Sequence, residues 1–165
     1  MQKKIPTLKI IFIINAVIFF ILIPTVQAQK ALRVIDFKRL EGSIHGYYRH
    51  RRMWVITDLG GWEEFLKQTN YSSKAAGQTS QPDFTKHMIV AVLQGWKAFG
   101  HGQFNIRVSD VIDEDRAIKV LVNEYLPGRF CPRTGAETTR CDVIEITRTD
   151  KRIVFQVKQN YLDCR

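Results

Sequence analysis

The residues best suited to molecular recognition lie in one glycine-containing segment between two apolar stretches. Its candidate contact residues are Trp96, Phe99, His101, Gln103 and Phe104. Glycines allow the backbone unusual conformations, and aromatic rings provide binding energy at a small cost in conformational entropy. We therefore predict a partner-binding loop in which the phenylalanines are buried and the polar side chains orient the contact. The alternative is that Trp96 and Phe99 fold back as a lid over the end of a sheet.

Motifs that would indicate catalysis are absent from the sequence. There is no G-x-S-x-G nucleophile elbow, no P-loop and no C-x-x-C pair. The four histidines show no metal-ligand spacing, so neither a metal nor a cofactor is expected. We expect a protein that is not an enzyme. A hydrolase that uses His101 with an unidentified acid is the weaker alternative.

The N-terminus has the features of a signal peptide. Three lysines precede the apolar run Ile10–Ile23, and small residues precede a cleavage position after Ala28. The apolar run is shorter than the roughly 20 residues of a spanning helix. Residues 1–28 are thus predicted to be removed before Gln29, leaving 29–165 as one exported domain, periplasmic or secreted, without a membrane span. The alternative is an uncleaved anchor.

The chain is basic, with a formal net charge of +9. The first 28 residues hold three lysines and no acid, so the remaining domain carries +6. Such a charge suggests acidic partners, anionic polymers or a membrane surface, whereas export argues against nucleic acid. Arg49, Arg51 and Arg52 form a candidate basic patch for an anionic envelope polymer. A charged strand edge that discourages aggregation is the simpler interpretation.

Three cysteines lie in the C-terminal third of the chain. Cys131 and Cys141 flank a turn-rich stretch and are ten residues apart. In an oxidising compartment they are the expected disulfide pair. Cys164 is left over, and it could instead pair with either of them, link to a partner or stay reduced.

The hydrophobic pattern predicts a mainly β (α+β) domain. Strands are expected over 33–40, 52–57, 88–93, 104–108, 118–122, 143–147 and 153–157, the last two forming a hairpin. Trp62, Phe65 and Leu66 share one face of a helix near 59–69, which Thr57 or Asp58 can cap. The expected fold is an antiparallel sheet, as a sandwich or half-barrel, with that helix packed on it.

The order of several short motifs resembles one known family. They are Trp62-Glu63-Glu64-Phe65, then Asp83-Phe84-Thr85-Lys86, a glycine-rich loop, Pro127-Gly128 and Val143-Ile144-Glu145-Ile146. This order resembles the C-terminal domain of the PrcB-type protease-complex-subunit family over about 52–157. The resemblance implies an exported, non-catalytic accessory domain that contacts another protein, with a secreted protease as the candidate partner and direct inhibition as a variant. The sequence does not indicate the oligomeric state.

Overall fold

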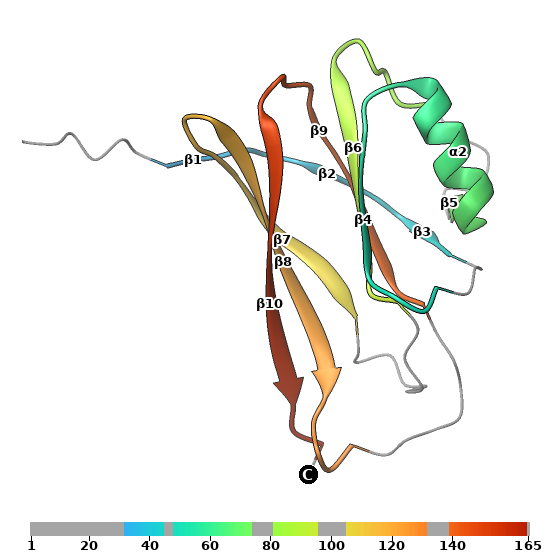
Figure 1. Cartoon of the computed structure of the whole chain (residues 1–165), viewed down its shortest axis with the longest axis vertical. Coiled ribbons are helices and arrows are strands. Elements are labelled where there is room, and N and C mark those ends of the chain that lie inside the picture. The colour runs from blue at the N-terminus through green and yellow to red at the C-terminus, as the bar shows by residue number, and fades with distance from the viewer. Residues whose placement is uncertain (1–31, 45–47, 74–80, 96–104, 132–138, 165) are drawn as a thin grey trace, which may run out of the picture. The chain divides into compact units, whose positions relative to one another are not determined.

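The computed structural model describes residues 32–44, 48–73, 81–95, 105–131 and 139–164. These residues form two four-stranded sheets, a two-stranded sheet and one helix (Figure 1). The predicted mainly β, α+β fold class is therefore confirmed, with the two large sheets packed as a sandwich.

Sheet A has its strands in the order β1-β7-β8-β10. They are β1 (Arg33–Val34), β7 (Ile106–Asp113), β8 (Ala117–Pro127) and β10 (Arg152–Leu162). β7 is antiparallel to both of its neighbours, whereas β10 runs parallel to β8 along all 11 of its residues. Parallel neighbours need a crossover connection, and here the chain passes through the other sheet between β8 and β10.

Sheet B is antiparallel throughout, in the order β2-β9-β6-β4. Its strands are β2 (Lys38–Leu40), β9 (Cys141–Thr147), β6 (His87–Leu93) and β4 (Arg52–Ile56). The small third sheet pairs β3 (Gly42–Ser43) with β5 (Ser72–Ser73). The sequence did not predict a strand at either of these positions.

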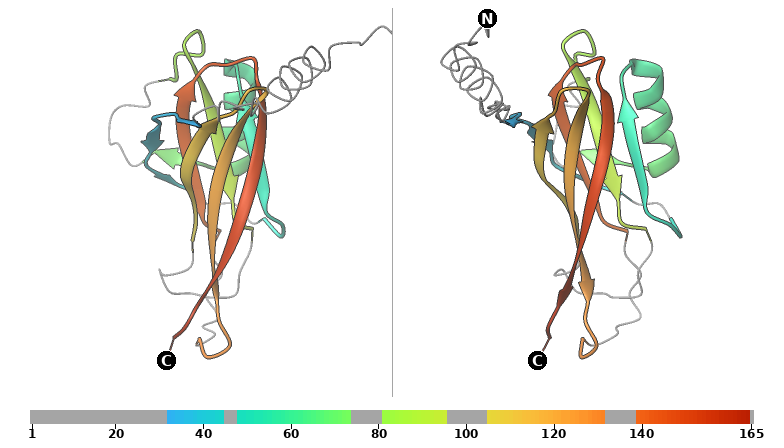
Figure 2. Two further views of the ribbon diagram at one scale, coloured as in Figure 1. Left: turned by 90° about the vertical axis from the view of Figure 1, so that its left-hand side faces the viewer. Right: turned by 60° about the vertical axis from the view of Figure 1, so that its left-hand side comes forward.

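The single helix among the described residues, α2 (Leu59–Thr69), covers the outer face of sheet B (Figure 2). The Asp58 carboxylate accepts a hydrogen bond from the Gly61 amide at 2.8 Å, which satisfies a free donor of the first turn. Asn70 ends the helix in the left-handed conformation, with φ of 46°. Both the predicted helix and one of its two predicted caps are confirmed.

Strand β6 lies at the centre of the core. Its residues Met88, Val90 and Val92 belong to the cluster between the two sheets. The alternate residues Ile89, Ala91 and Leu93 belong to a second cluster, beneath α2. The strand predicted over 88–93 is confirmed. Because both of its faces are buried, the domain has three layers: sheet A, sheet B and the helix.

The predicted hairpin of 143–147 with 153–157 is wrong. β9 pairs with β6 and β2, whereas β10 pairs with β8 in the other sheet. An alternating strand needs an apolar surface opposite its inner face, and two such strands can meet across the core instead of side by side. For the same reason the single strand expected over 33–40 is divided into β1 and β2, which belong to different sheets.

Replacing Phe65 by alanine should destabilise the domain by about 3–5 kcal/mol, because it empties a filled site under the helix. The ring is 2% exposed, stacks on Trp62 at 5.4 Å and meets the edge of Trp54 at 5.4 Å. Urea unfolding followed by tryptophan fluorescence measures the change. Leu59→Ala is the control, since Leu59 is 41% exposed on the same helix. Equal unfolding midpoints for the two variants would contradict the assignment.

Candidate functional site

One end of the sandwich brings together residues that are distant in the sequence. We call it the disulfide end and define it by Arg52, Leu93, Ile106, Cys141 and Leu162, the strand termini that lie there (Figure 1). The predicted partner-binding loop is attached at this end, because Gly95 precedes it and Asn105 follows it. The residues Trp96, Phe99, His101, Gln103 and Phe104 themselves lie outside the described residues.

A buried carboxylate organises this end. Glu124 of β8 is 2% exposed, and its Oε2 atom accepts hydrogen bonds from Arg51 Nη1 at 2.8 Å and from Gln159 Nε2 at 3.0 Å. A charge this deeply buried requires a partner of opposite charge. Arg51, predicted as part of a basic patch, is therefore committed to Glu124 and does not offer a free positive charge.

A buried amide joins the two sheets at the same place. Gln94, which follows β6 and is 2% exposed, donates through Nε2 to the Tyr125 carbonyl at 3.0 Å. The main-chain amide of Gln94 donates to the Arg140 carbonyl at 2.9 Å. The buried Asn105 Oδ1 atom, by contrast, has no hydrogen-bond partner within the described part of the chain. The Asn105 carbonyl accepts a hydrogen bond from the Tyr125 amide at 2.7 Å, so Gln94 and Asn105, on either side of the predicted loop segment, are both bonded to β8.

The basic segment and the base of the predicted loop meet at Gly95. This glycine has φ of +79°, and a Cβ atom placed on it would lie 2.6 Å from the His50 carbonyl carbon. Only glycine allows both the left-handed backbone and this close approach. The structure therefore brings together, at the disulfide end, the segment 49–52 and the residue that precedes the predicted loop.

The three arginines of the predicted patch differ in environment. Arg51 binds the buried Glu124, and the Arg52 guanidinium lies over the Tyr48 ring at 5.7 Å. Arg49 is exposed. Of the three, Arg49 is thus the residue best placed for a purely electrostatic contact.

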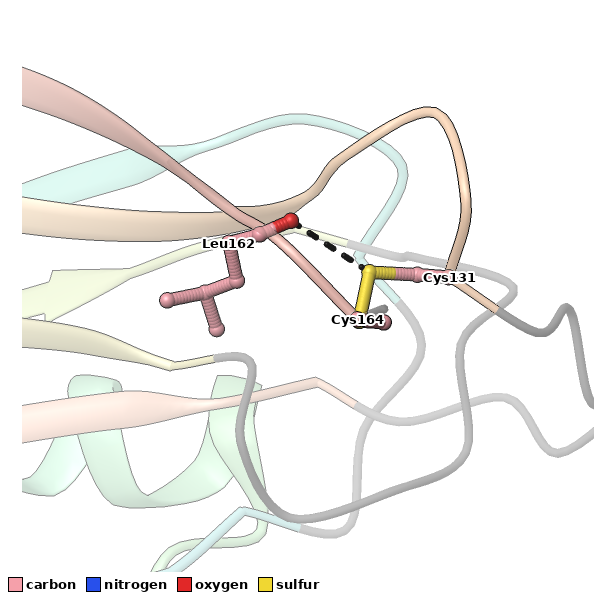
Figure 3. Close-up of a disulfide and its surroundings, with 3 residues drawn as sticks. All are labelled: Cys131, Leu162 and Cys164. Atoms are coloured by element: carbon pink, nitrogen blue, oxygen red, sulfur yellow. Dashed lines mark hydrogen bonds between the residues drawn. A yellow bond between two sulfur atoms is a disulfide. The ribbon is translucent and has the colours of Figure 1, made fainter.

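The predicted Cys131–Cys141 disulfide is wrong, because Cys131 is bonded to Cys164 (Figure 3). The parallel strands β8 and β10 end side by side, with Leu162 opposite Pro127, so the residues that follow them are neighbours. The Gly128 amide donates to the Leu162 carbonyl at 3.0 Å and so joins the ends of the two strands. Cys141 begins β9 in the other sheet, opposite Leu93.

Cys141 is a free cysteine whose environment opposes ionisation. Burial and the neighbouring Asp142 carboxylate raise the pKa of its thiol to about 12. The thiol is protonated at neutral pH and is a poor nucleophile in this state.

The described residues contain neither a metal-binding cluster nor a membrane-spanning helix. Within these ranges no group of three or more His, Cys, Asp or Glu side chains is arranged to hold a metal ion. No helix in the same ranges is long and apolar enough to cross a membrane. The predicted cleavage position between Ala28 and Gln29 lies outside the described residues.

Sequence reasoning missed the buried polar residues Glu124, Gln94 and Gln159. Glu124 did carry a signal, because it occupies an inward position in the series Val120, Val122, Glu124, Leu126. A charged residue in an otherwise apolar alternating face requires a specific partner. The identity of that partner could not be obtained from the pattern.

No family model, no curated protein and no solved structure matches this chain. The resemblance to the PrcB-type family stays a prediction.

Arg51→Ala should destabilise the domain by about 1–3 kcal/mol, because it leaves the Glu124 carboxylate buried without its cation. Adding Glu124→Gln should recover part of the loss by removing the buried charge. Arg49→Ala is the matched control and should change the free energy of unfolding by less than about 0.5 kcal/mol. Urea unfolding measures all of them, and equal effects of the two arginine substitutions would contradict the role assigned to Arg51.

Removing the disulfide with Cys131→Ser/Cys164→Ser should lower the free energy of unfolding by about 4 kcal/mol, because the bond closes a loop with a sequence separation of 33. Peptide mapping of the oxidised wild-type domain should recover the Cys131–Cys164 linkage. The control Cys141→Ser should keep that linkage. A Cys131–Cys141 peptide would overturn the assignment.

Proposed function

We propose that this protein is an exported, non-catalytic binding module that contacts another protein through the disulfide end of its sandwich. The observation that supports the proposal is the crossing of His50 over Gly95, which gives the basic segment 49–52 and the predicted loop a common base. Loops held by a rigid sandwich are a frequent arrangement for protein recognition.

The chemistry available at this end suits a protein partner. Tyr161 and Phe130 are exposed there by 69% and 58%. Tyrosine and arginine are enriched among the residues that dominate interface energies. The charge of +6 on the domain favours an acidic partner surface. The family resemblance adds a secreted protease as the candidate partner, held as an accessory subunit or inhibited directly.

Binding of an anionic envelope polymer through Arg49, Arg51 and Arg52 is the alternative. The ion pair between Arg51 and Glu124 weakens it, because one of the three charges is neutralised internally. Polymer binding would decline steeply with rising salt concentration. A protein contact with an apolar centre would decline much less.

The proposal is tested by affinity capture from the native envelope and secreted fractions, with residues 29–165 as bait. One specific protein should be retained, and Trp96→Ala or Phe99→Ala should weaken its binding by about 1–3 kcal/mol if either ring is an anchor. Leu59→Ala, on the outer helix, is the control and should bind normally. Capture of salt-sensitive envelope material without a specific protein would contradict the proposal and favour the polymer.

A further inference from the structure

Strand β10 is a long edge strand. It ends the order β1-β7-β8-β10, and β8 is its only strand neighbour among the described residues. Its 11 residues exceed the five of β4, which is the corresponding edge of sheet B. Figure 2 shows β10 running beside β8. Edge strands present main-chain donors and acceptors that another extended chain can bind.

The hydrogen bonds at the disulfide end identify which β10 residues face the free edge. Gly128 N donates to the Leu162 carbonyl, so Leu162 directs its main-chain groups toward β8. On the other side of β8, the Tyr125 amide donates to the Asn105 carbonyl. The main-chain groups of odd-numbered residues of β8 therefore face β7, and those of even-numbered residues face β10. Successive residues of a strand point their main-chain groups to opposite sides. The main-chain groups that point to the free edge therefore belong to Ile153, Phe155, Val157, Gln159 and Tyr161. We call these the outward-facing residues, with reference to their main chain only.

We propose that the free edge of β10 binds an extended acidic segment of a partner protein as an additional strand. This proposal rests on the proposed function, because it specifies how the partner is held. Arg152 and Lys158 are exposed on β10, and the strand contains no acidic residue. An acidic segment offers opposite charges along this edge, whereas a second copy of β10 would add only further cations.

The edge is continuous with the disulfide end. Gln159 of β10 and Arg51 bind the same oxygen of Glu124, at 3.0 and 2.8 Å. Tyr161, two residues further along the edge, is 69% exposed. A partner segment that pairs with β10 therefore reaches the basic segment 49–52 and Tyr161 at the disulfide end.

The free protein gives the first test, by amide hydrogen exchange measured with NMR on residues 29–165. The amides of Phe155, Val157 and Gln159 should exchange at least about tenfold faster than those of Gln156 and Lys158, which bond to β8. The even-numbered amides are the internal control. Equal protection of both sets would show that the edge is already occupied and would overturn the proposal.

The second test adds a synthetic peptide of alternating glutamate and valine, matched to the 11 residues of β10. It should slow exchange of the outward-facing amides by about tenfold at saturation and leave the amides bonded to β8 unchanged. The same peptide with lysine in place of glutamate, or N-methylated at alternate residues, should not protect them. Lys158→Glu should weaken binding of the acidic peptide about tenfold, while Lys67→Glu on α2 should not.

The outcomes separate the two proposals. A captured partner that binds without protecting the outward-facing β10 amides overturns the edge proposal and leaves the binding function intact. Failure of the acidic peptide to protect these amides also overturns the edge proposal. Absence of any captured protein overturns the proposed function, and the exchange pattern with the peptide then still decides whether the edge accepts a strand.

Discussion

The burial of β6 on both faces is the constraint on which the rest of this structure depends. Six of its seven residues are buried, and they alternate between two apolar clusters. A strand of this composition cannot face water on either side without losing about 25 cal/mol for each Å² of apolar surface. Sheet A must therefore cover one face and α2 the other. The three layers are the consequence of this one strand.

Buried polar groups then fix how the two sheets are aligned. Asp142 of β9 accepts hydrogen bonds from Arg39 Nε and from the Val108 amide, both at 2.8 Å. Arg39 also donates to the Val108 carbonyl at 2.9 Å, beside the irregularity in β7 between Val108 and Asp110. Such pairs contribute little net stability, but a displaced sheet would leave the carboxylate buried and unpaired. The alignment of β7 with β9 is therefore specified by polar contacts as well as by apolar packing.

The edge strands of the two sheets differ in length and in what covers them. Sheet B has short edges and a helix over its outer face, whereas sheet A has the full length of β10 at its margin. At the tip, Leu126 and Pro127 of β8 lie beyond the last residue paired with β7 and have only β10 as a strand neighbour among the described residues. An isolated pair of strands is marginally stable. The Cys131–Cys164 disulfide links the residues that follow these two strands.

The helix and the longer strands follow from the sequence alone, whereas the division of 33–40 into β1 and β2 does not. The spacing of Trp62 and Phe65 with an acidic cap specified α2, and the apolar run 88–93 specified a strand buried on both faces, because helix and strand periods are properties of the chain. Only the tertiary structure decided which strands became neighbours, that β8 and β10 run parallel, that Cys131 bonds to Cys164, and that Arg51 binds Glu124 instead of solvent. Alternating hydrophobicity indicates that a strand has one buried face. It does not indicate which sheet the strand joins or which strands become its neighbours. Pairings between distant residues depend on that choice, so they appear only when the sheets have assembled.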